Sequence, residues 1–350
     1  MRLALRTLRV AGLGLGGLIV AFAVFYLWGS SGFDDTDPLP VPPERYGGHR
    51  SFTPPVARAS RIRVVSWNIA YARGRKDDAG DLRDEATIRR NLVGIAHLLR
   101  TLDADVVALQ EVDFGAARTH GIDEVAWLAR EAGYPWAARV ETWNCRYIPF
   151  PYWPPSQHYG RMRSGQAVLS RFPIASNVRH LLPQPDENPF WYNAFYLHRA
   201  LQHVELSVGG GITLDVLNVH LEAFHQRNRE RHADLLVSRV RSLPDRPRLV
   251  LGDFNAIPPE AVLRARFPDE LETDMTTDRT IATVRTLGLQ EALPPETPDV
   301  DSFTFPADVP NRRLDYVWFS PDTRRISARV VREAGPLSDH LPVLAEIEFR

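Results

Sequence analysis

The sequence predicts an α/β fold, a two-sheet mixed β-sandwich flanked by helices and preceded by one N-terminal transmembrane helix. Short runs rich in leucine and β-branched residues recur from residue 61 onward, as in strands. Amphipathic helical patterns separate some of these runs, which is typical of α/β proteins. The second half is richer in strand patterns than in helical ones, which favours a mixed sandwich over a doubly wound parallel sheet.

The first segment with a clear prediction is residues 11–28, which carry no charge. As a helix they would extend roughly 27 Å, about the thickness of the hydrocarbon core of a bilayer. Residues 1–10 are basic, with Arg2, Arg6 and Arg9, so the N-terminus is expected in the cytoplasm and the rest of the chain outside it. The alternative is a cleaved signal peptide followed by secretion. The apolar run is longer than the ~7–15 residues usual for a signal, although small residues follow it in "WGSSG".

Residues 29–60 predict a semi-extended, proline-rich linker, and the folded catalytic domain is expected to span residues 61–350. The prolines that exclude a long helix in this linker are Pro38, Pro40, Pro42, Pro43, Pro54 and Pro55.

Within the domain, residues 85–101 predict a long amphipathic helix, with apolar residues three or four positions apart. Residues 229–243 predict a second such helix, and residues 261–267 and 281–287 predict shorter ones.

The chain has 350 residues and a formal net charge of −1, and it is more acidic without the three N-terminal arginines. This weakens the case for duplex nucleic-acid binding, which usually needs a basic face. Cys145 is the only cysteine, which excludes an intrachain disulfide and a thiolate metal cluster.

Polar residues recur where the predicted strands end. Any one such end is explained by a turn. The whole set, however, is what a hydrolase that uses a hard metal ion needs, and strand ends on one rim of a sheet would bring it together. Its members are Asn68, Glu111, His220, Asp253, Asn255, Asp315, Asp339 and His340.

These residue types suit hydrolysis of a phosphoester. Glu111 and Asn68 offer the oxygen ligands that Mg²⁺ prefers, with Mn²⁺ possible and zinc less suited. Asp253 could take a proton from water while an adjacent carboxamide holds that water. His220 and His340 could donate to phosphate oxygens, one of them kept protonated by a neighbouring carboxylate.

The motifs "SWNIA", "ALQEVD", "AVLSRFPI", "NVHLE", "GDFNA", "RRLDYVWFS" and "SDHLPV" resemble, in order, those of the endonuclease/exonuclease/phosphatase superfamily, which has the deoxyribonuclease I-like fold. The resemblance covers residues 61–350. It implies metal ligation by Asn68 and Glu111, with Asp339 as a further metal contact. It also implies catalytic roles for His220, Asp253, Asn255, Asp315 and His340, in which Asp315 orients the second histidine.

Two departures from the family pattern are visible. Gly165-Gln166 stands where the family commonly has Gly-Asn, which puts a phosphate contact from Gln166 in doubt. The signatures of inositol polyphosphate 5-phosphatases are missing, since Ala256 follows "GDFN".

The substrate is less determined, because one fold serves many substrates. Asn218 and Arg163 are candidates for substrate contact. Two aromatic-rich stretches, "WNCRYIPFPYWPPSQHYGR" and "NPFWYNAFYLHR", would suit a membrane interface, base stacking or plain packing. The partners expected are a lipid headgroup or a nucleic acid as substrate, and a membrane through the N-terminal helix, with the protein a monomer. The alternatives left open are a nuclease, a sphingomyelinase- or phospholipase C-like enzyme, and a catalytically silent binding module.

Overall fold

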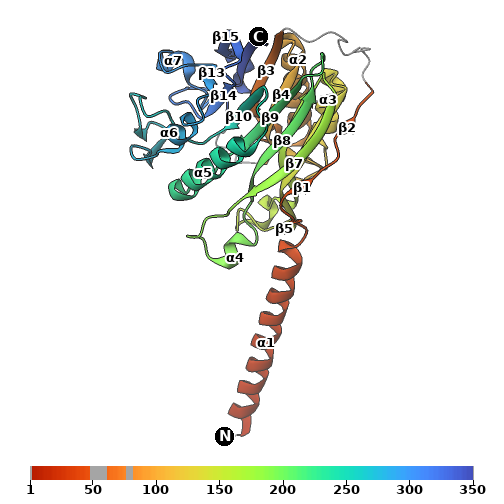
Figure 1. The fold of residues 1–350 in the computed structure, drawn as a ribbon. Helices are drawn as coiled ribbons and strands as arrows, with labels where there is room; N and C mark the ends of the chain where they lie inside the picture. Colours follow the sequence, from red (N-terminus) through yellow and green to blue (C-terminus); the bar gives the residue numbers. More distant parts are fainter. Residues whose placement is uncertain (1, 48–60, 76–81, 350) are drawn as a thin grey trace.

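The computed structural model describes residues 2–47, 61–75 and 82–349. Two seven-stranded mixed sheets pack face to face, with helices on their outer faces (Figure 1). This confirms the predicted fold class.

The first sheet has the order β1-β7-β8-β9-β10-β14-β13. Its strands are β1 (Leu39–Pro40), β7 (Ile174–Leu182), β8 (Arg199–Ser207), β9 (Thr213–His220), β10 (Arg248–Asp253), β14 (Asp315–Phe319) and β13 (Gln290–Glu291). The second sheet has the order β15-β16-β3-β4-β6-β5-β2. Its strands are β15 (Thr323–Val330), β16 (Val343–Phe349), β3 (Arg61–Asn68), β4 (Val106–Asp113), β6 (Gly160–Ser170), β5 (Trp136–Ile148) and β2 (Glu44–Arg45). A separate hairpin joins β11 (Ala265–Phe267) and β12 (Glu270–Asp274).

The flanking helices bury the faces that their apolar spacing predicts. Ile88, Leu92 and Leu99 of α2 (Glu85–Leu102) enter the main core, and the Asp84 side chain caps this helix by accepting from the Thr87 N–H. Leu236 of α5 (Gln226–Ser242) packs with strands of the first sheet. The other helices are α3 (Glu124–Ala132), α4 (Phe190–Asn193), α6 (Thr280–Arg285) and α7 (Asp299–Ser302), with short 3₁₀ turns at Ala70–Ala72, Ala117–Thr119, Pro155–Gln157 and Arg332–Leu337.

Three of the four predicted helices are present, near their predicted bounds. The fourth, at residues 261–267, is wrong, because residues 261–264 are irregular and residues 265–267 form β11.

Helix α1 (Arg2–Ser30) extends away from the sandwich, and its stretch Gly12–Ser30 is long and apolar enough to cross a membrane (Figure 1). A signal sequence near an N-terminus would have the same length and composition. The end of the helix contacts the domain, because the ring of Phe25 lies 5.9 Å from that of Tyr147 and the ring of Tyr26 lies 5.5 Å from that of Phe195.

The first part of the predicted linker is attached to the domain. β1 pairs with β7 and β2 pairs with β5, so each sheet gains an edge strand from residues 39–45. Phe33 stacks on His198 at 4.0 Å, and Arg179 donates hydrogen bonds to the Asp34 and Thr36 carbonyls. The rest of the predicted linker, residues 48–60, lies outside the described residues.

The parallel pairs explain where polar side chains meet. β3 runs parallel to β4 and β9 runs parallel to β10, so within each sheet two carboxyl ends lie side by side. In register, Asn68 lies opposite Gln110 and Asp253 opposite His220. The main core between the sheets therefore ends in a polar edge formed by four strands.

Candidate active site

Three strand ends from both sheets meet at Asn68. Its Nδ2 donates to Glu111 Oε1 at 3.1 Å and to Asp253 Oδ2 at 3.0 Å. Its Oδ1 accepts from the Ala70 N–H and, like any carbonyl oxygen, has a second lone pair. One carboxamide thus links the ends of β3, β4 and β10.

Two of the predicted site residues have a left-handed backbone that is unusual outside glycine. Glu111 has φ 51° at a bulge in β4, and Asn255 has φ 49° just after β10. Such conformations cost about 1–3 kcal/mol each and persist where the surrounding structure enforces them. At Glu111 the bulge brings the carboxylate to the end of the sheet beside Asn68.

Asp253 is the centre of the cluster and is 1% exposed. The Asn255 N–H donates to its Oδ1 at 2.9 Å, while His220 Nε2 and His340 Nε2 lie 3.5 and 3.8 Å from its Oδ2. Burial raises the pKa of Asp253 to about 7; the nearby Asp315 adds to this rise and the nearby His340 opposes it. A carboxyl with a pKa near neutrality is suited to proton transfer.

The two histidines are held in different charge states. Burial would lower the pKa of His340, but the charges of Asp315 and Asp253 outweigh burial and raise that pKa to about 10. His340 Nδ1 lies 2.9 Å from Asp315 Oδ2, which fixes the ring. Burial, followed by the charges of Arg199 and His340, lowers the pKa of His220 well below its ordinary value. At neutral pH the site therefore presents one cationic and one neutral imidazole.

The turn that carries His340 is tied to β3. The Ser338 hydroxyl donates to the Asn68 carbonyl at 2.8 Å and accepts from the His340 N–H at 3.2 Å. Trp67 Nε1 donates to the His340 carbonyl at 2.9 Å. The "SDH" segment is thus held in place by contacts with the strand that carries Asn68.

This geometry can be compared with known proteins. The profile of the endonuclease/exonuclease/phosphatase family matches residues 65–340. The chain belongs to this family. Proteins of the endonuclease/exonuclease/phosphatase family are in general phosphoester hydrolases. A search of curated protein sequences found no match.

Solved structures of the family share the fold. A family protein from Beutenbergia cavernae is 22% identical, with a TM-score of 0.57 over 83% of this chain and 72% of that one. A mannosyl-6-phosphatase from Bacteroides thetaiotaomicron is 17% identical, with a TM-score of 0.53 over 82% and 100%. D. rerio TDP2, solved with a single-strand DNA product, is 16% identical, with a TM-score of 0.54 over 83% and 100%. At these identities the likeness is one of fold.

Most of the family-type residues predicted from the sequence lie in this one cluster. The structure brings together Asn68, Glu111, His220, Asp253, Asn255, Asp315 and His340. Asn255 Nδ2 donates to the Leu221 carbonyl, which fixes its carboxamide beside Asp253.

Asp339 lies beside the cluster, but its carboxylate has a cationic partner. Arg73 Nη2 donates to Asp339 Oδ2 at 2.5 Å, and both side chains are largely buried. Arg73 neutralises this carboxylate and so competes with the metal contact predicted for it. Sequence reasoning missed Arg73, whose position five residues after Asn68 gives no motif signal.

The two predicted substrate contacts, Asn218 and Arg163, have other protein partners. Asn218 is fully buried between the sheets, where its Nδ2 faces the Leu109 and Ala167 carbonyls and its Oδ1 accepts from Gln110. This placement argues against a substrate contact by Asn218. Arg163 is half-exposed on β6 and forms an ion pair with Glu141. Gln166 is buried and donates to the Asn218 carbonyl, which agrees with the doubt raised by its departure from the family pattern.

The donor set fits a hard divalent cation, the kind of metal this fold generally binds. Glu111 keeps a third of its side chain exposed, and its carboxylate and the Asn68 carboxamide are oxygen donors. Asp253, Asp315 and His340 also have donor atoms within 4.8 Å of one another. A second group, His203, Glu205 and Asp215, lies at the other end of the strands, where the Arg246 guanidinium already pairs with both carboxylates.

We expect Gly252→Ala to destabilise the domain without replacing any of the predicted catalytic residues. Gly252 has φ 143°, and a Cβ there would lie 1.9 Å from the Val219 carbonyl oxygen of β9. The clash and the backbone strain together should cost about 3 kcal/mol or more, which lowers the unfolding midpoint by roughly 10 °C. Thermal unfolding checks this, with Gly47→Ala as the control, because a Cβ at Gly47 meets nothing within 4 Å. Equal midpoints for the two variants would contradict the close approach of β10 to β9.

Proposed function

We propose that this protein is a membrane-anchored, divalent-metal-dependent phosphoester hydrolase in which Asp253 activates the attacking water. The observation that carries the proposal is the setting of Asp253, a buried carboxyl with a pKa of about 7 that lies near two imidazoles and accepts from the Asn68 carboxamide and the Asn255 backbone N–H. Helix α1 would anchor the chain, with the basic N-terminus in the cytoplasm and the domain on the other side.

Each side chain has a role that follows from its position. Asp253 accepts a proton from water, and the adjacent Asn255 carboxamide orients that water. Cationic His340 donates to a non-bridging oxygen and stabilises the charge that grows during attack, while Asp315 holds its ring. Neutral His220 offers a second donor on the same face of Asp253. A divalent cation held by Glu111 and Asn68 would neutralise the negative phosphoryl group.

Two substrate classes remain candidates for this chemistry, a lipid phosphodiester and a nucleic acid. A binding module that lost activity is a weaker alternative, because every catalytic residue type of the family is in place. The test uses the full chain in detergent or nanodiscs, with bis-p-nitrophenyl phosphate, plasmid DNA and sphingomyelin as parallel substrates. Mg²⁺, Mn²⁺ and EDTA are compared. We expect turnover of at least one substrate, and we expect EDTA to abolish it. If folded protein turns over none of the substrates, the proposal that this protein is a phosphoester hydrolase is contradicted.

We expect Glu111→Gln to raise the Mg²⁺ concentration needed for the half-maximal rate. The amide keeps the size of the side chain but removes the charge that would face the cation. Loss of one ligating carboxylate should weaken metal binding by about tenfold or more. Rates measured across a Mg²⁺ titration check this, with Glu333→Gln as the control, since Glu333 is exposed and pairs only with Arg329 among the described residues. An unchanged metal requirement would remove Glu111 from the metal site.

A further inference from the structure

The most exposed aromatic side chains gather at one end of the sandwich. Outside α1, the exposed Phe, Tyr and Trp side chains of the described residues all lie in three loops, β5–β6, β7–β8 and β9–α5. Trp153 and Phe190 are both 81% exposed and Phe224 is 78% exposed. Aromatic surface of this kind usually marks an interaction site. We call this set the aromatic rim, and it comprises Phe150, Tyr152, Trp153, Phe190, Trp191, Tyr192 and Phe224.

Strand register places these loops at the catalytic end. Leu182 pairs with Arg199 at the base of the β7–β8 loop, and Leu201 pairs with Val219, the residue before His220. In the second sheet, Asp113 pairs with Ser164 and Ile148 with Gly160, so the carboxyl end of β4 faces the β5–β6 loop. The aromatic rim and the Asp253 cluster therefore lie at the same end of the two sheets.

Helix α1 meets the domain at this same end. Figure 1 shows its upper end beside β5 and α4. Tyr147, which contacts Phe25, is the penultimate residue of β5, and Phe195, which contacts Tyr26, belongs to the β7–β8 loop. With α1 across a bilayer, both loops would lie at the level where the helix leaves the hydrocarbon.

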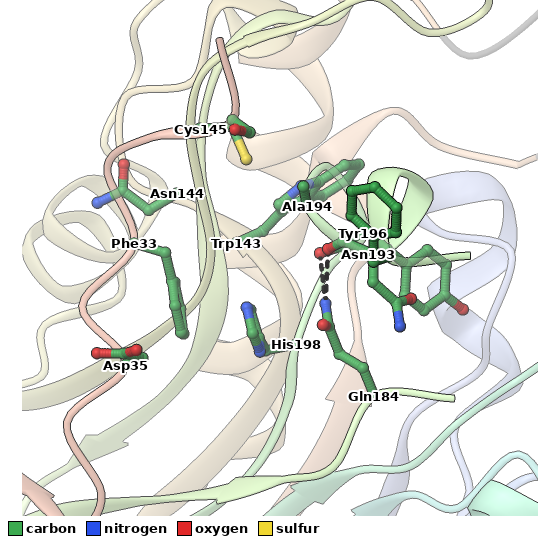
Figure 2. Close-up of a pocket in the computed structure, with 12 residues that line it drawn as sticks. Phe33, Asp35, Trp143, Asn144, Cys145, Gln184, Asn193, Ala194, Tyr196 and His198 are labelled. Carbon is green, nitrogen blue, oxygen red and sulfur yellow. Dashed lines mark hydrogen bonds between the residues drawn. The ribbon is translucent and has the colours of Figure 1, made fainter. Parts of the chain in front are cut away.

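The chain between α1 and the sandwich is attached to the domain by several contacts. After α1, the ring of Phe33 stacks on that of His198. The chain then forms β1, which pairs with the first sheet, and β2, which pairs with the second sheet. A hollow of about 470 Å³ lies between the helix end and the α4 loop, lined by aromatic and polar side chains that include Phe33, Trp143, Tyr196 and His198 (Figure 2). The predicted catalytic residues do not line this hollow. These contacts set the orientation of the domain relative to the helix.

The charge of the loops distinguishes a lipid surface from a nucleic acid. Residues 149–159, 183–198 and 221–225, which form the three loops, contain no lysine or arginine, and they include the acidic Asp186, Glu187 and Glu222. Stacking of nucleic-acid bases on aromatic residues is accompanied by a positively charged groove that follows the phosphates. Tryptophan, tyrosine and phenylalanine without basic residues suit the headgroup region of a bilayer.

We propose that the aromatic rim rests in the headgroup region of the bilayer that α1 crosses, so that the catalytic end of the sandwich faces the lipid surface. The proposal depends on the membrane anchoring proposed above for α1. A phosphoester of a lipid headgroup would then reach the Asp253 cluster from the leaflet on which the domain rests.

The experiment labels single introduced cysteines with an environment-sensitive fluorophore in the full chain, reconstituted in phosphatidylcholine nanodiscs that contain a doxyl-labelled lipid quencher. Trp153→Cys and Trp191→Cys report on the rim, Val20→Cys reports on α1, and Val262→Cys, at a site 92% exposed away from the three loops, is the control. Cys145 does not interfere, because it is buried and burial raises the pKa of its thiol to about 11.

We expect blue-shifted emission and lipid quenching at positions 153, 191 and 20, and neither at position 262. If positions 153 and 191 behave like position 262 while position 20 is quenched, the helix is anchored and the rim proposal is wrong. If position 20 is not quenched, the proposed anchoring by α1 is wrong. Quenching at positions 153 and 191 alone would mean that the rim contacts the lipid surface although the helix does not cross the bilayer. Quenching at none of the four positions overturns both proposals.

Discussion

Asp253→Asn is expected to lower turnover by about 10²–10⁴-fold, which is the usual contribution of a positioned general base. The amide has the shape of the carboxylate but cannot accept the proton of the attacking water. Its Oδ1 can still accept from the Asn255 N–H, which holds the native side chain at 2.9 Å. Steady-state rates on bis-p-nitrophenyl phosphate at saturating Mg²⁺ check this expectation.

The same substitution should leave the fold intact, although the new Nδ2 would face the Asn68 Nδ2 that donates to Oδ2 in the native chain. Burial raises the pKa of Asp253, which means that the folded protein disfavours the charge that the amide removes. Because this gain offsets the lost hydrogen bond from Asn68, an unfolding midpoint close to that of the native chain should accompany the loss of activity. Asp186→Asn is the control, because its side chain is 88% exposed. Undiminished turnover by folded Asp253→Asn protein would refute the proposed mechanism.

The fold class could be predicted from the sequence because strand and helix patterns alternate and because the polar strand ends recur in order. The sequence could not indicate that short segments pair with the edges of the two sheets. Leu39–Pro40 and Glu44–Arg45 are two-residue strands within a proline-rich stretch, and they exist because the edges of β7 and β5 accept them. A local pattern carries no information on such tertiary pairing. The same limit explains residues 261–267, where a helical pattern gives way to β11 and its partner β12.

The grouping of most candidate site residues could be predicted, because they follow strands whose carboxyl ends meet, and their roles stay predictions. Asn218 shows where this reasoning fails. It lies in β9 two residues before His220, so its side chain is on the same face of the strand, but the twisted sheets bury it against Gln110 and Gln202. The distance of a residue from the end of its strand decides whether its carboxamide is buried in the core or lies in the active site. The spacing of residues in the sequence does not reveal where the strand end lies. Arg73 was missed because its partnership with Asp339 joins residues far apart in the chain.

Asp315→Asn is expected to reduce kcat/KM by about 10²–10³-fold at pH 8, the usual loss when one donor to a developing charge is removed. In the native chain the charges of Asp315 and Asp253 outweigh burial and raise the pKa of His340 from its ordinary 6.5 to about 10. The variant loses the carboxylate with the larger effect, so the pKa of His340 falls and a smaller fraction of its ring is protonated at pH 8. Activity should partly recover as the pH is lowered and the ring regains its proton.

The interaction between Asp315 and His340 can also be measured through folding stability, which does not depend on turnover. Because the pKa of His340 is raised in the folded state, its contribution is fully present below pH 6.5 and is lost as the pH rises through about 10. The free energy of unfolding of the native chain should therefore fall across this range, and that of Asp315→Asn should fall less. Asp322→Asn, at an exposed position after β14, is the control for both measurements. If Asp315→Asn keeps native activity and native pH dependence of unfolding, then Asp315 does not set the charge of His340, and the role proposed for this histidine fails.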